Sequence, residues 1–484
     1  MITNTKKTIS KRYLKSRWKH FLSRNSNGVL LVEGISVEEL RRKYGTPLYI
    51  FIEEEVRKKL REFKGAFDYD KFKPEYACKC NSNLEILRIV REEGFDFDAS
   101  SVGEIILGLL ADFEPWQITF TNLNKTQQDI LFAASIGVKS ITVDSLEEID
   151  KAVEVASKLR RNIPLLIRVN PMIKEGKYST QSQQYGIPYA YVKRAINKVL
   201  SAEYLELKGF HFHGSYAYSP KSYILSAEKL IKLAQYCLEK GTEISVIDLG
   251  GGFPPEAPRQ YKPGKYFTPQ ELADKFLPTF LKMIEQSGIR KPTLVFEPGK
   301  SIIANSGIGL FEVISKKNLK NKEILVTNAS CYSMFPDILV SHVNYEVLPA
   351  NDMLSRRTNK YDIAGCTCDC VDIIAKNQMM PLTNVGDMFA LMDCGAYSYV
   401  MGSNFNNLKR PPMILIKPDG AVKMIRRRDR YSEMFAPELD VLKVADPEEL
   451  KKFYNMSRVN LNTVWGREKN GAGNGENCVV VKGK

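Results

Sequence analysis

Short apolar runs alternate with amphipathic helical stretches through residues 45–309 of this 484-residue chain. Apolar residues recur at helical spacing in the stretches, whereas the runs between them are short and rich in β-branched and aromatic residues. This repeated alternation predicts parallel strands joined by helical crossovers. The runs that we predict to be strands are 46–51, 74–79, 95–100, 116–122, 139–144, 163–170, 207–214, 244–253 and 292–299.

The number of predicted strands decides between two architectures of the α/β class. About nine strands are too many for a small open sheet and close to the number in a (β/α)₈ barrel. We therefore expect a barrel over 45–309, with a doubly wound sheet as the alternative. After Gly309 the pattern changes to short β-rich runs separated by turn residues, which predicts an all-β domain over 310–445. The segment 28–34 also reads as a strand and is expected to join that domain.

The net charge of +14 is concentrated at one end of the chain. Residues 1–32 hold eight Lys or Arg and no Asp or Glu, so the rest of the chain has an ordinary excess of six. A solvated basic extension over 1–44 is the simplest interpretation, with a surface helix or a weak membrane or RNA anchor as alternatives. One basic arm does not predict a nucleic-acid or membrane partner. Four apolar residues recur at helical spacing within the arm: Leu14, Trp18, Phe21 and Leu22.

The composition is that of an ordinary globular protein, with 44% hydrophobic and 26% charged residues. No apolar run approaches the roughly 20 residues that a membrane helix needs, and the first residues lack the apolar core of a signal peptide. Nine Cys are an odd number and too few for a disulfide scaffold, so we expect a cytoplasmic protein with reduced thiols. The polar tail 446–484 is expected to be flexible.

Reactive residues follow several of the predicted barrel strands, and strand ends form the active-site face of such barrels. Lys79 ends one strand, where desolvation would favour a neutral amine and Schiff-base chemistry, although a lone lysine is more often an ordinary surface residue. Asp98 and Glu297 follow two other strands, and His211 and His213 alternate on a third. Two His can ligate a metal, but no HExxH motif or Cys/His cluster lies nearby, so no metal is expected.

Three glycines and three cysteines add weaker signals. Backbone N–H groups of Gly250, Gly251 and Gly252 can approach a phosphate closely, although the GxGxxG pattern of a dinucleotide site is absent. The cysteines alternate in sequence, which predicts a strand with all three on one face. That arrangement suits a metal poorly; it fits one reactive thiol beside two packed ones, or three buried small hydrophobes. These cysteines are Cys366, Cys368 and Cys370.

Seven motifs stand in a specific order along the chain: YACKCN (76–81), FDASSVGEI (97–105), HFHGS (211–215), IDLGGGF (247–253), EPGK (297–300), CTCDCVD (366–372) and GAYSYVMGSNFN (395–406). Through them the chain resembles the fold-type III pyridoxal-phosphate decarboxylases, the ornithine/diaminopimelate/arginine decarboxylase family, over about three quarters of its length. The resemblance implies an alanine-racemase-like barrel with a β domain and pyridoxal 5'-phosphate as cofactor. It also implies a homodimer whose active sites are shared across the interface.

The resemblance also implies roles for individual residues. Lys79 would hold the cofactor through a Schiff base, and Glu297 would keep the pyridine nitrogen protonated. His213 would stack on the ring, with Asp98 beside it. Cys368 of the partner subunit would return a proton to the substrate carbon after CO₂ leaves, since a thiol pKa of roughly 8.5 suits that step. The residues around the phosphate would be Ser215, Gly250, Gly251, Gly252, Gly299, Lys300 and Tyr397.

The substrate is harder to predict than the reaction. The segments 44–51 and 121–145 are most similar to diaminopimelate decarboxylases, but several residues depart from that subfamily. Its Glu after the proton-donating Cys is Asp369 here, the Arg of its EPGR motif is Lys300, and its Arg-Pro is Phe335-Pro336. Two Arg that would clamp a distal carboxylate bidentately are thus missing.

Asp369 favours a distal ammonium on the substrate, in a pocket shaped by Tyr332 and Phe335. We therefore expect decarboxylation of a basic diamino acid of ornithine or lysine type, with either enantiomer open. Diaminopimelate is the first alternative, and a larger or carrier-linked amino acid is the second. A non-catalytic regulatory homologue is a further alternative, although it would be expected to lack Lys79 or Cys368. The decarboxylase motif around Cys368 argues against a racemase.

Overall fold

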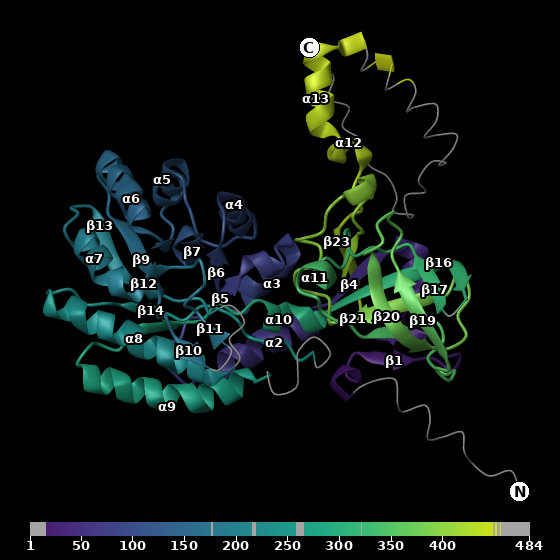
Figure 1. The fold of residues 1–484 in the computed structure, drawn as a ribbon, viewed down its shortest axis with the longest axis horizontal. Helices are drawn as coiled ribbons and strands as arrows, with labels where there is room; N and C mark the ends of the chain where they lie inside the picture. Colours follow the sequence, from purple (N-terminus) through teal and green to yellow (C-terminus); the bar gives the residue numbers. More distant parts are fainter. Residues whose placement is uncertain are drawn as a thin grey trace, which may run out of the picture.

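Eight parallel strands curl into a barrel at one end of the computed structural model (Figure 1). The structure describes residues 16–175, 178–214, 219–257, 266–320 and 322–448, with 451, 452 and 455, and the eight strands are counted among these. Neighbouring strands pair in chain order. The first and last strands also meet, because the N–H of Glu75 donates to the carbonyl of Phe296 at 2.9 Å. The strands are β5 (Glu75–Ala77), β6 (Asp96–Ala99), β7 (Ile118–Thr121), β8 (Ser140–Val143), β9 (Ile163–Asn170), β13 (Leu205–His211), β14 (Val246–Asp248) and β15 (Thr293–Val295).

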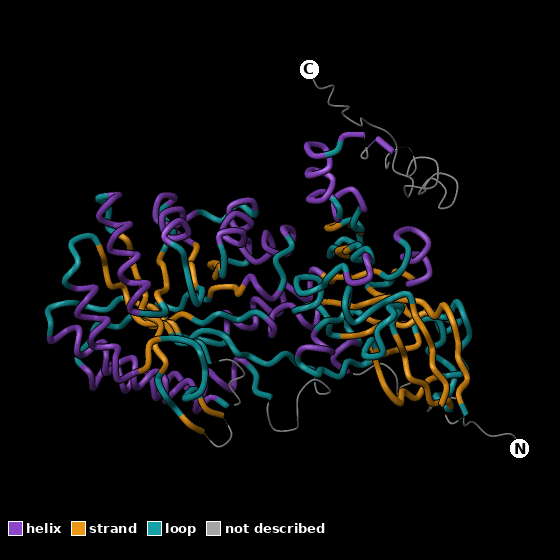
Figure 2. The backbone as a smooth tube through the Cα atoms, turned by 45° about the horizontal axis from the view of Figure 1, so that its top comes forward, coloured by secondary structure: helices purple, strands orange, loops and turns teal. Residues whose placement is uncertain are grey.

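Helices lie around the outside of these strands (Figure 2). Several begin at polar caps: the side chains of Ser101, Thr126 and Thr268 each accept a backbone N–H bond from the first helical turn. A cap of this kind stabilises a helix by about 1 kcal/mol. No helix in the described ranges is both long and apolar enough to cross a membrane. The helices are α2 (Glu53–Gly65), α3 (Leu84–Glu92), α4 (Val102–Leu110), α5 (Gln127–Ile136), α6 (Leu146–Leu159), α7 (Tyr189–Leu200), α8 (Pro220–Glu239) and α9 (Pro269–Ser287).

The second part of the molecule is rich in strands and carries its own sheet, ordered β20-β19-β17-β16-β4-β22-β23, with β21 and β18 branching from β16. Most of its neighbouring strands are antiparallel, as in β16 and β17. The predicted combination of a (β/α)₈ barrel and a β domain is therefore confirmed, and the doubly wound alternative is wrong. The strands are β4 (Leu48–Ile52), β16 (Gly307–Leu319), β17 (Lys322–Thr327), β18 (Val347–Pro349), β19 (Asn359–Ala364), β20 (Ile373–Met380), β21 (Met388–Met392), β22 (Met413–Ile416) and β23 (Val422–Arg426).

Shorter elements lie within and beside these two parts. The two that matter most for the site are η2 (Cys78–Cys80), which follows β5, and α11 (Asp337–Val340), which lies in the β domain. Near the end of the described chain, α13 (Ala436–Ala445) projects away from both parts (Figure 1). The remaining elements are η1 (Ser16–Trp18), β1 (Leu22–Arg24), β2 (Leu30–Val32), β3 (Ile35–Ser36), α1 (Val37–Tyr44), η3 (Pro115–Gln117), β10 (Lys174–Glu175), β11 (Tyr178–Ser179), β12 (Ile187–Pro188), α10 (Lys300–Ile303), η4 (Ala304–Ser306), η5 (Phe405–Asn407) and α12 (Tyr431–Met434).

The first predicted barrel strand, 46–51, belongs to the other sheet. Leu48 of β4 pairs with Leu310 of β16, and Tyr49 pairs with Met413 of β22. All five residues of β4 are buried. A fully apolar run reads the same in a barrel as in the centre of any other sheet, so periodicity alone did not distinguish the two. The prediction for 46–51 was wrong, and the other eight predicted strands form the barrel.

The basic arm is not a solvated extension where the structure describes it. Trp18, Phe21 and Leu22 are buried in an apolar cluster with residues of β4 and β22, and the guanidinium of Arg17 contacts the carboxylate of Asp393 at 2.6 Å. The predicted strand at 28–34 contains β2, whose residues join the same cluster. Leu14 and the basic residues before it lie outside the described residues, as does most of the polar tail.

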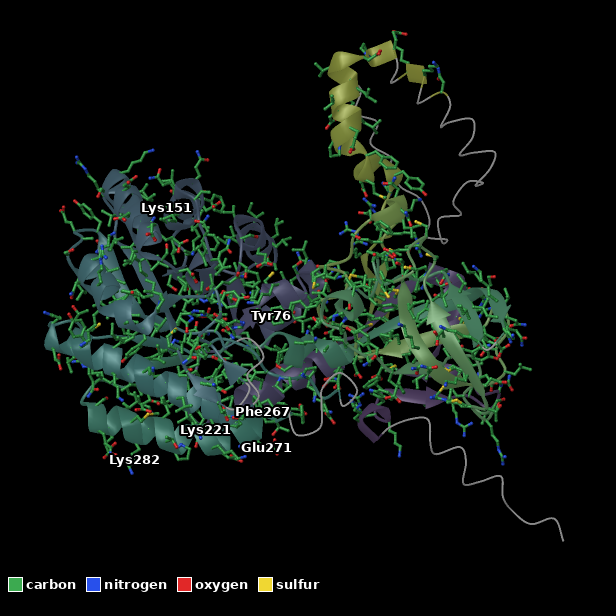
Figure 3. All side chains as sticks on the ribbon, viewed as in Figure 1. Tyr76, Lys151, Lys221, Phe267, Glu271 and Lys282 are labelled. Carbon is green, nitrogen blue, oxygen red and sulfur yellow. The ribbon has the colours of Figure 1, made fainter. Side chains whose placement is uncertain are left out.

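The two parts meet close to the end of β5. Tyr76 lies at this junction (Figure 3) and its hydroxyl donates to the carbonyl of Asn81 at 3.1 Å. The side-chain amide of Asn81 donates in turn to the carbonyl of Gly395 at 3.0 Å, and the N–H of Tyr397 donates to the carbonyl of Cys80 at 2.9 Å. The β domain is thus tied by hydrogen bonds to the segment that carries Lys79.

Candidate active site

A cavity of about 420 Å³ opens at the C-terminal ends of the barrel strands. Its lining includes Lys79, His213, Glu297 and Lys300 from the barrel, as well as residues from the β domain, among them Asp337 of α11. The strands are parallel, so residues that follow different strands are brought to one face of the barrel. This explains how positions more than 200 residues apart in sequence come together.

Lys79 points into this cavity from η2. Its Nζ lies 3.9 Å from the Oδ2 atom of Asp98, because Ala77 and Asp98 are register partners on β5 and β6. Burial alone would lower the pKa of Lys79, but the carboxylates of Asp98 and Glu297 outweigh burial and raise that pKa above its ordinary value. The sequence predicted a neutral amine at this position. The environment instead favours the charged form, so Lys79 is a cation beside Asp98 and Glu297.

Glu297 is buried and surrounded by histidines. Nε2 of His211 lies 3.0 Å from its Oε1 atom, and Nδ1 of His213 lies 3.7 Å from its Oε2 atom. Burial raises the pKa of Glu297. Burial, with Lys79 and Arg168 nearby, lowers the pKa of both histidines well below its ordinary value. Both imidazoles are therefore neutral at neutral pH, and His211 can donate Nε2–H to the carboxylate.

The ring of His213 has a defined tautomer. The N–H of Gly251 donates to its Nδ1 atom at 2.9 Å, so the ring proton is on Nε2. One nitrogen of His211 and one carboxylate oxygen each of Asp248 and Glu297 lie within 4.8 Å of one another, a spacing that also fits the ligands of a metal ion. The strand-end lysine beside this group favours an organic cofactor instead.

The glycine-rich segment after β14 makes a close backbone approach. A Cβ atom on Gly250, whose φ is +64°, would lie 2.3 Å from the carbonyl oxygen of Phe212, and one on Gly251 would lie 2.5 Å from that of Glu297. Only glycine at 250 and 251 allows these backbones to pack together. At Gly299 a Cβ would instead meet a side chain, at 2.2 Å from Sγ of Cys80. Gly252 lines the cavity, and Ser215 lies outside the described residues.

The remaining predicted cofactor and substrate residues separate into two groups. Lys300 and Tyr397 line the cavity, whereas Cys368, Asp369, Tyr332 and Phe335 are not in its lining. Phe335 is fully buried and packs on Phe311, with ring centroids 5.7 Å apart. Its predicted role as a substrate-contacting residue is therefore wrong, because an aromatic side chain at this position fills the core of the β domain.

Cys366, Cys368 and Cys370 do not share one face of a strand. They lie in the loop between β19 and β20, where the carboxylate of Asp372 accepts bonds from the N–H and hydroxyl of Thr367 at 3.1 and 2.7 Å. Hydrogen bonds to a side chain thus replace a strand ladder here. Cys368 and Cys370 are exposed, and the amide of Asn406 lies 3.4 Å from Sγ of Cys368.

Asp369 and Tyr332 form a pair beside this loop. The hydroxyl of Tyr332 donates to Oδ2 of Asp369 at 2.5 Å, and its ring lies 4.3 Å from that of Phe405. This hydrogen bond lowers the pKa of Asp369, which is therefore ionised at neutral pH. The exposed thiol and this carboxylate are thus neighbours on the surface of the β domain and lie outside the cavity of their own chain.

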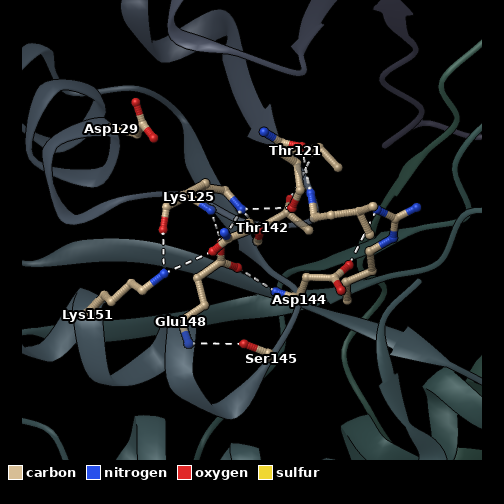
Figure 4. A network of polar contacts seen from close by, with 12 residues as sticks. Thr121, Lys125, Asp129, Thr142, Asp144, Ser145, Glu148 and Lys151 are labelled. Carbon is tan, nitrogen blue, oxygen red and sulfur yellow. Dashed lines mark hydrogen bonds and ion pairs between the residues drawn. The ribbon is translucent and has the colours of Figure 1, made fainter. Parts of the chain in front are cut away.

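The sequence did not single out two charged residues of the cavity lining. Arg168 on β9 lines the cavity and contacts Asp144 at 3.4 Å. Asp144 and Glu148 belong to a buried polar network with Lys125 (Figure 4), in which Nζ of Lys125 contacts Glu148 at 3.2 Å. Asp337 is the second missed residue. Polar residues inside apolar runs were the available signal for Arg168, and none was available for Asp337.

The residues present fit pyridoxal phosphate. A cationic lysine, a buried carboxylate and a histidine face one cavity, and Gly252 of the glycine segment lines the same cavity. Residues 53–304 match the family model described as "Pyridoxal-dependent decarboxylase, pyridoxal binding domain". The chain belongs to this family and is a pyridoxal-phosphate-dependent amino-acid decarboxylase.

Similar proteins include diaminopimelate decarboxylases from several organisms. A diaminopimelate decarboxylase of Methanothermobacter thermautotrophicus is 31% identical over 85% of this chain and 95% of its own. One from Staphylococcus aureus is 30% identical over 84% of this chain and 96% of its own. The crystal structure of the M. jannaschii diaminopimelate decarboxylase with L-lysine has a TM-score of 0.79 and 27% identity, covering 86% of this chain and 97% of that one.

Proposed function

We propose that this chain is a diaminopimelate decarboxylase, which removes the carboxylate from the D-configured centre of meso-diaminopimelate and releases L-lysine. The observation that carries the proposal is the similarity to diaminopimelate decarboxylases along nearly the whole chain. These comparisons favour diaminopimelate over the ornithine- or lysine-type substrate that the sequence analysis preferred. The buried position of Phe335 also removes part of the argument for that preference.

Pyridoxal phosphate, when bound, supplies an electron-accepting ring for the electrons that CO₂ leaves behind. Lys79 would bind its aldehyde carbon and exchange it for the substrate amine. Glu297, oriented by His211, would keep a proton on the pyridine nitrogen, with Asp98 near Lys79 and His213 against the ring face. Gly252 and Gly299, with Ser215 and Tyr397, would bind the phosphate. The N–H groups of Gly250 and Gly251 instead donate to Asp248 and His213 and so hold this segment in place. Lys300 follows Gly299 in the cavity lining.

Cys368 would donate the final proton, and it would do so in a second copy of the chain. The support is that Cys368 is exposed and outside the lining of its own cavity. Asp369 and Tyr332 lie beside it and would reach the partner's substrate with it. We accordingly propose a homodimer with shared sites. We also propose a cytoplasmic location, with which the eight free cysteines of the described chain agree.

The test is a substrate panel with purified, cofactor-loaded protein. We expect lysine and CO₂ from meso-diaminopimelate with a kcat/KM at least about tenfold above that for either enantiomer of ornithine or lysine. A tenfold ratio corresponds to about 1.4 kcal/mol of discrimination. Equal or better use of any basic amino acid would refute the proposal. Loss of CO₂ release in Lys79→Ala is the control for a contaminating decarboxylase.

A further inference from the structure

An ion pair between the barrel and the β domain forms part of the cavity wall. Nζ of Lys300, the first residue of α10, lies 2.7 Å from Oδ2 of Asp337, the first residue of α11. The Lys300 side chain is 13% exposed and that of Asp337 is 4% exposed. Both residues line the cavity that also contains Lys79. The pair therefore faces whatever occupies the cavity.

The backbone on the barrel side of this pair is held in place. Gly299 packs against Cys80 so closely that no Cβ fits between them. Nζ of Lys300 also lies 5.7 Å from the centroid of the Tyr397 ring. Asp337 is buried at the start of its helix. A pair with little exposure and fixed backbones is screened less by water than a surface pair, so its charges act on nearby ligand groups.

The pair leaves this wall of the cavity electrically neutral. Lys79, Arg168 and Lys300 are the Lys and Arg residues in the cavity lining. Lys79 and Arg168 contact the acids Asp98 and Asp144 respectively. Arg168 supplies the one guanidinium among the described lining residues. The two further arginines expected for a distal carboxylate are absent, because position 300 is Lys and position 335 is a buried Phe. A lone carboxylate at this wall would meet Asp337 as well as Lys300, and a lone ammonium would meet Lys300.

We propose that Asp337 is a specificity-determining residue and that the Lys300–Asp337 pair binds a zwitterionic group at the far end of the substrate. Lys300 would donate to the distal carboxylate, and Asp337 would accept from the distal ammonium, so that charges alternate around the group. This inference rests on the proposed function, since the distal centre of meso-diaminopimelate carries both charges. It explains how the chain accepts that substrate without the two arginines expected for it.

Three substrates that share a D-configured reacting centre separate the two contacts. Meso-diaminopimelate has both distal charges, D-lysine has only the ammonium, and D-2-aminopimelate has only the carboxylate. For the wild-type protein we expect kcat/KM for meso-diaminopimelate to exceed that for each of the other two by at least about tenfold. This is the size expected for one lost hydrogen bond to a charged group.

Each variant should remove one contact. Asp337→Asn should lower kcat/KM for meso-diaminopimelate and D-lysine about tenfold or more, while D-2-aminopimelate is unchanged or improved. Lys300→Met should lower the values for meso-diaminopimelate and D-2-aminopimelate by at least about tenfold more than the value for D-lysine. The double variant, which leaves no unpaired buried charge, should retain no preference for the zwitterion. If one of the single variants does not fold, the substrate preference of the double variant still shows whether the Lys300–Asp337 pair recognises the zwitterion.

Two measurements separate a role in substrate recognition from a general structural effect and from a role in cofactor binding. Glu323→Gln breaks a Lys–carboxylate pair elsewhere in the β domain, at 3.1 Å from Lys316, and should leave all three values unchanged. The dissociation constant of pyridoxal phosphate, measured by absorbance titration, should change less than about threefold in Asp337→Asn. If Lys300→Met weakens cofactor binding and leaves the substrate preferences intact, Lys300 serves the phosphate and the inference is refuted.

Parallel loss of activity on all three substrates would also refute it, because a general defect has no distal-group preference. Failure of the proposed function would look different. In that event the wild-type protein itself would not prefer meso-diaminopimelate over the panel. If the wild-type preference holds and both variants keep it, the proposed function stands and only the role of Asp337 falls.

Discussion

Nε2 of His211 lies 3.0 Å from Oε1 of Glu297, and both side chains are buried beneath the cavity. Neutral imidazole donates one hydrogen bond at this nitrogen and so fixes the orientation of the carboxylate. A charged imidazole would instead neutralise Glu297, and the carboxylate would then stabilise a proton on a neighbouring group less strongly. The pair therefore depends on the neutral state that burial imposes on His211.

This dependence predicts a pH effect on stability. The pKa of His211 is well below its ordinary value in the folded protein, so the unfolded chain binds a proton there first. The stabilising contribution is complete above about pH 6.5 and is lost as pH falls below it, by at most about 1.4 kcal/mol per pH unit. His211→Asn removes this group, so thermal unfolding of the cofactor-loaded variant should depend less on pH between about 7 and 5 than that of the wild-type protein. Equal slopes would contradict the prediction.

Lys79→Ala should abolish covalent attachment of the cofactor. Lys79 is the lysine that lies 3.9 Å from Asp98 in the cavity, and alanine has no amine with which to bind the aldehyde. After borohydride treatment, peptide mass spectrometry should find the modified lysine in the wild-type protein and none in the variant. Lys139→Ala is a suitable control because that lysine pairs with Glu75 and Asp96, outside the cavity lining. A modified peptide from Lys79→Ala would mean that another lysine carries the cofactor.

Cys368→Ala mixed with Lys79→Ala should recover activity that neither variant has alone. Cys368 is exposed and absent from the lining of its own cavity, so a mixed dimer would contain one site with both residues. We expect about a quarter of wild-type activity if subunits mix at random, since half of the dimers are mixed and each has one intact site of two. Absence of recovery in a verified heterodimer would argue that the sites are not shared.

Phe335→Leu should change stability and leave substrate choice as it is. The Phe335 ring packs on Phe311 in the core of the β domain, and a smaller side chain there leaves a partly filled space that costs about 1–3 kcal/mol. The melting temperature should fall, while the ratio of kcat/KM for meso-diaminopimelate to that for D-lysine stays within about twofold. A changed ratio at unchanged stability would return Phe335 to the substrate pocket.

Much of the fold follows from local patterns. Alternating strand and helix periods predicted the barrel, and eight of the nine predicted strands form it. The positions of Lys79, His213 and Glu297 near strand ends were also predictable, because a parallel barrel brings such ends to one face. Each of these conclusions depends on residues within one short segment and on a rule that applies to every barrel.

Other features were inaccessible because they depend on segments far apart in the chain. Leu48 pairs with Leu310, and nothing near Leu48 distinguishes that partner from a barrel strand. Trp18 looked like part of an exposed arm until the β domain supplied an apolar cluster to bury it. The alternating cysteines predicted a strand, but the side chain of Asp372 organises a loop there instead.

The sequence by itself determined the class of fold, the order of the motifs and the residue types available for chemistry. Tertiary structure alone decided which charges meet. Lys300 was expected beside a phosphate and Asp337 was not singled out, yet the packing of α11 against the mouth of the barrel brings them to 2.7 Å. The physical reason is that an ion pair requires two side chains at one place, and their separation in space is set by the packing of whole domains.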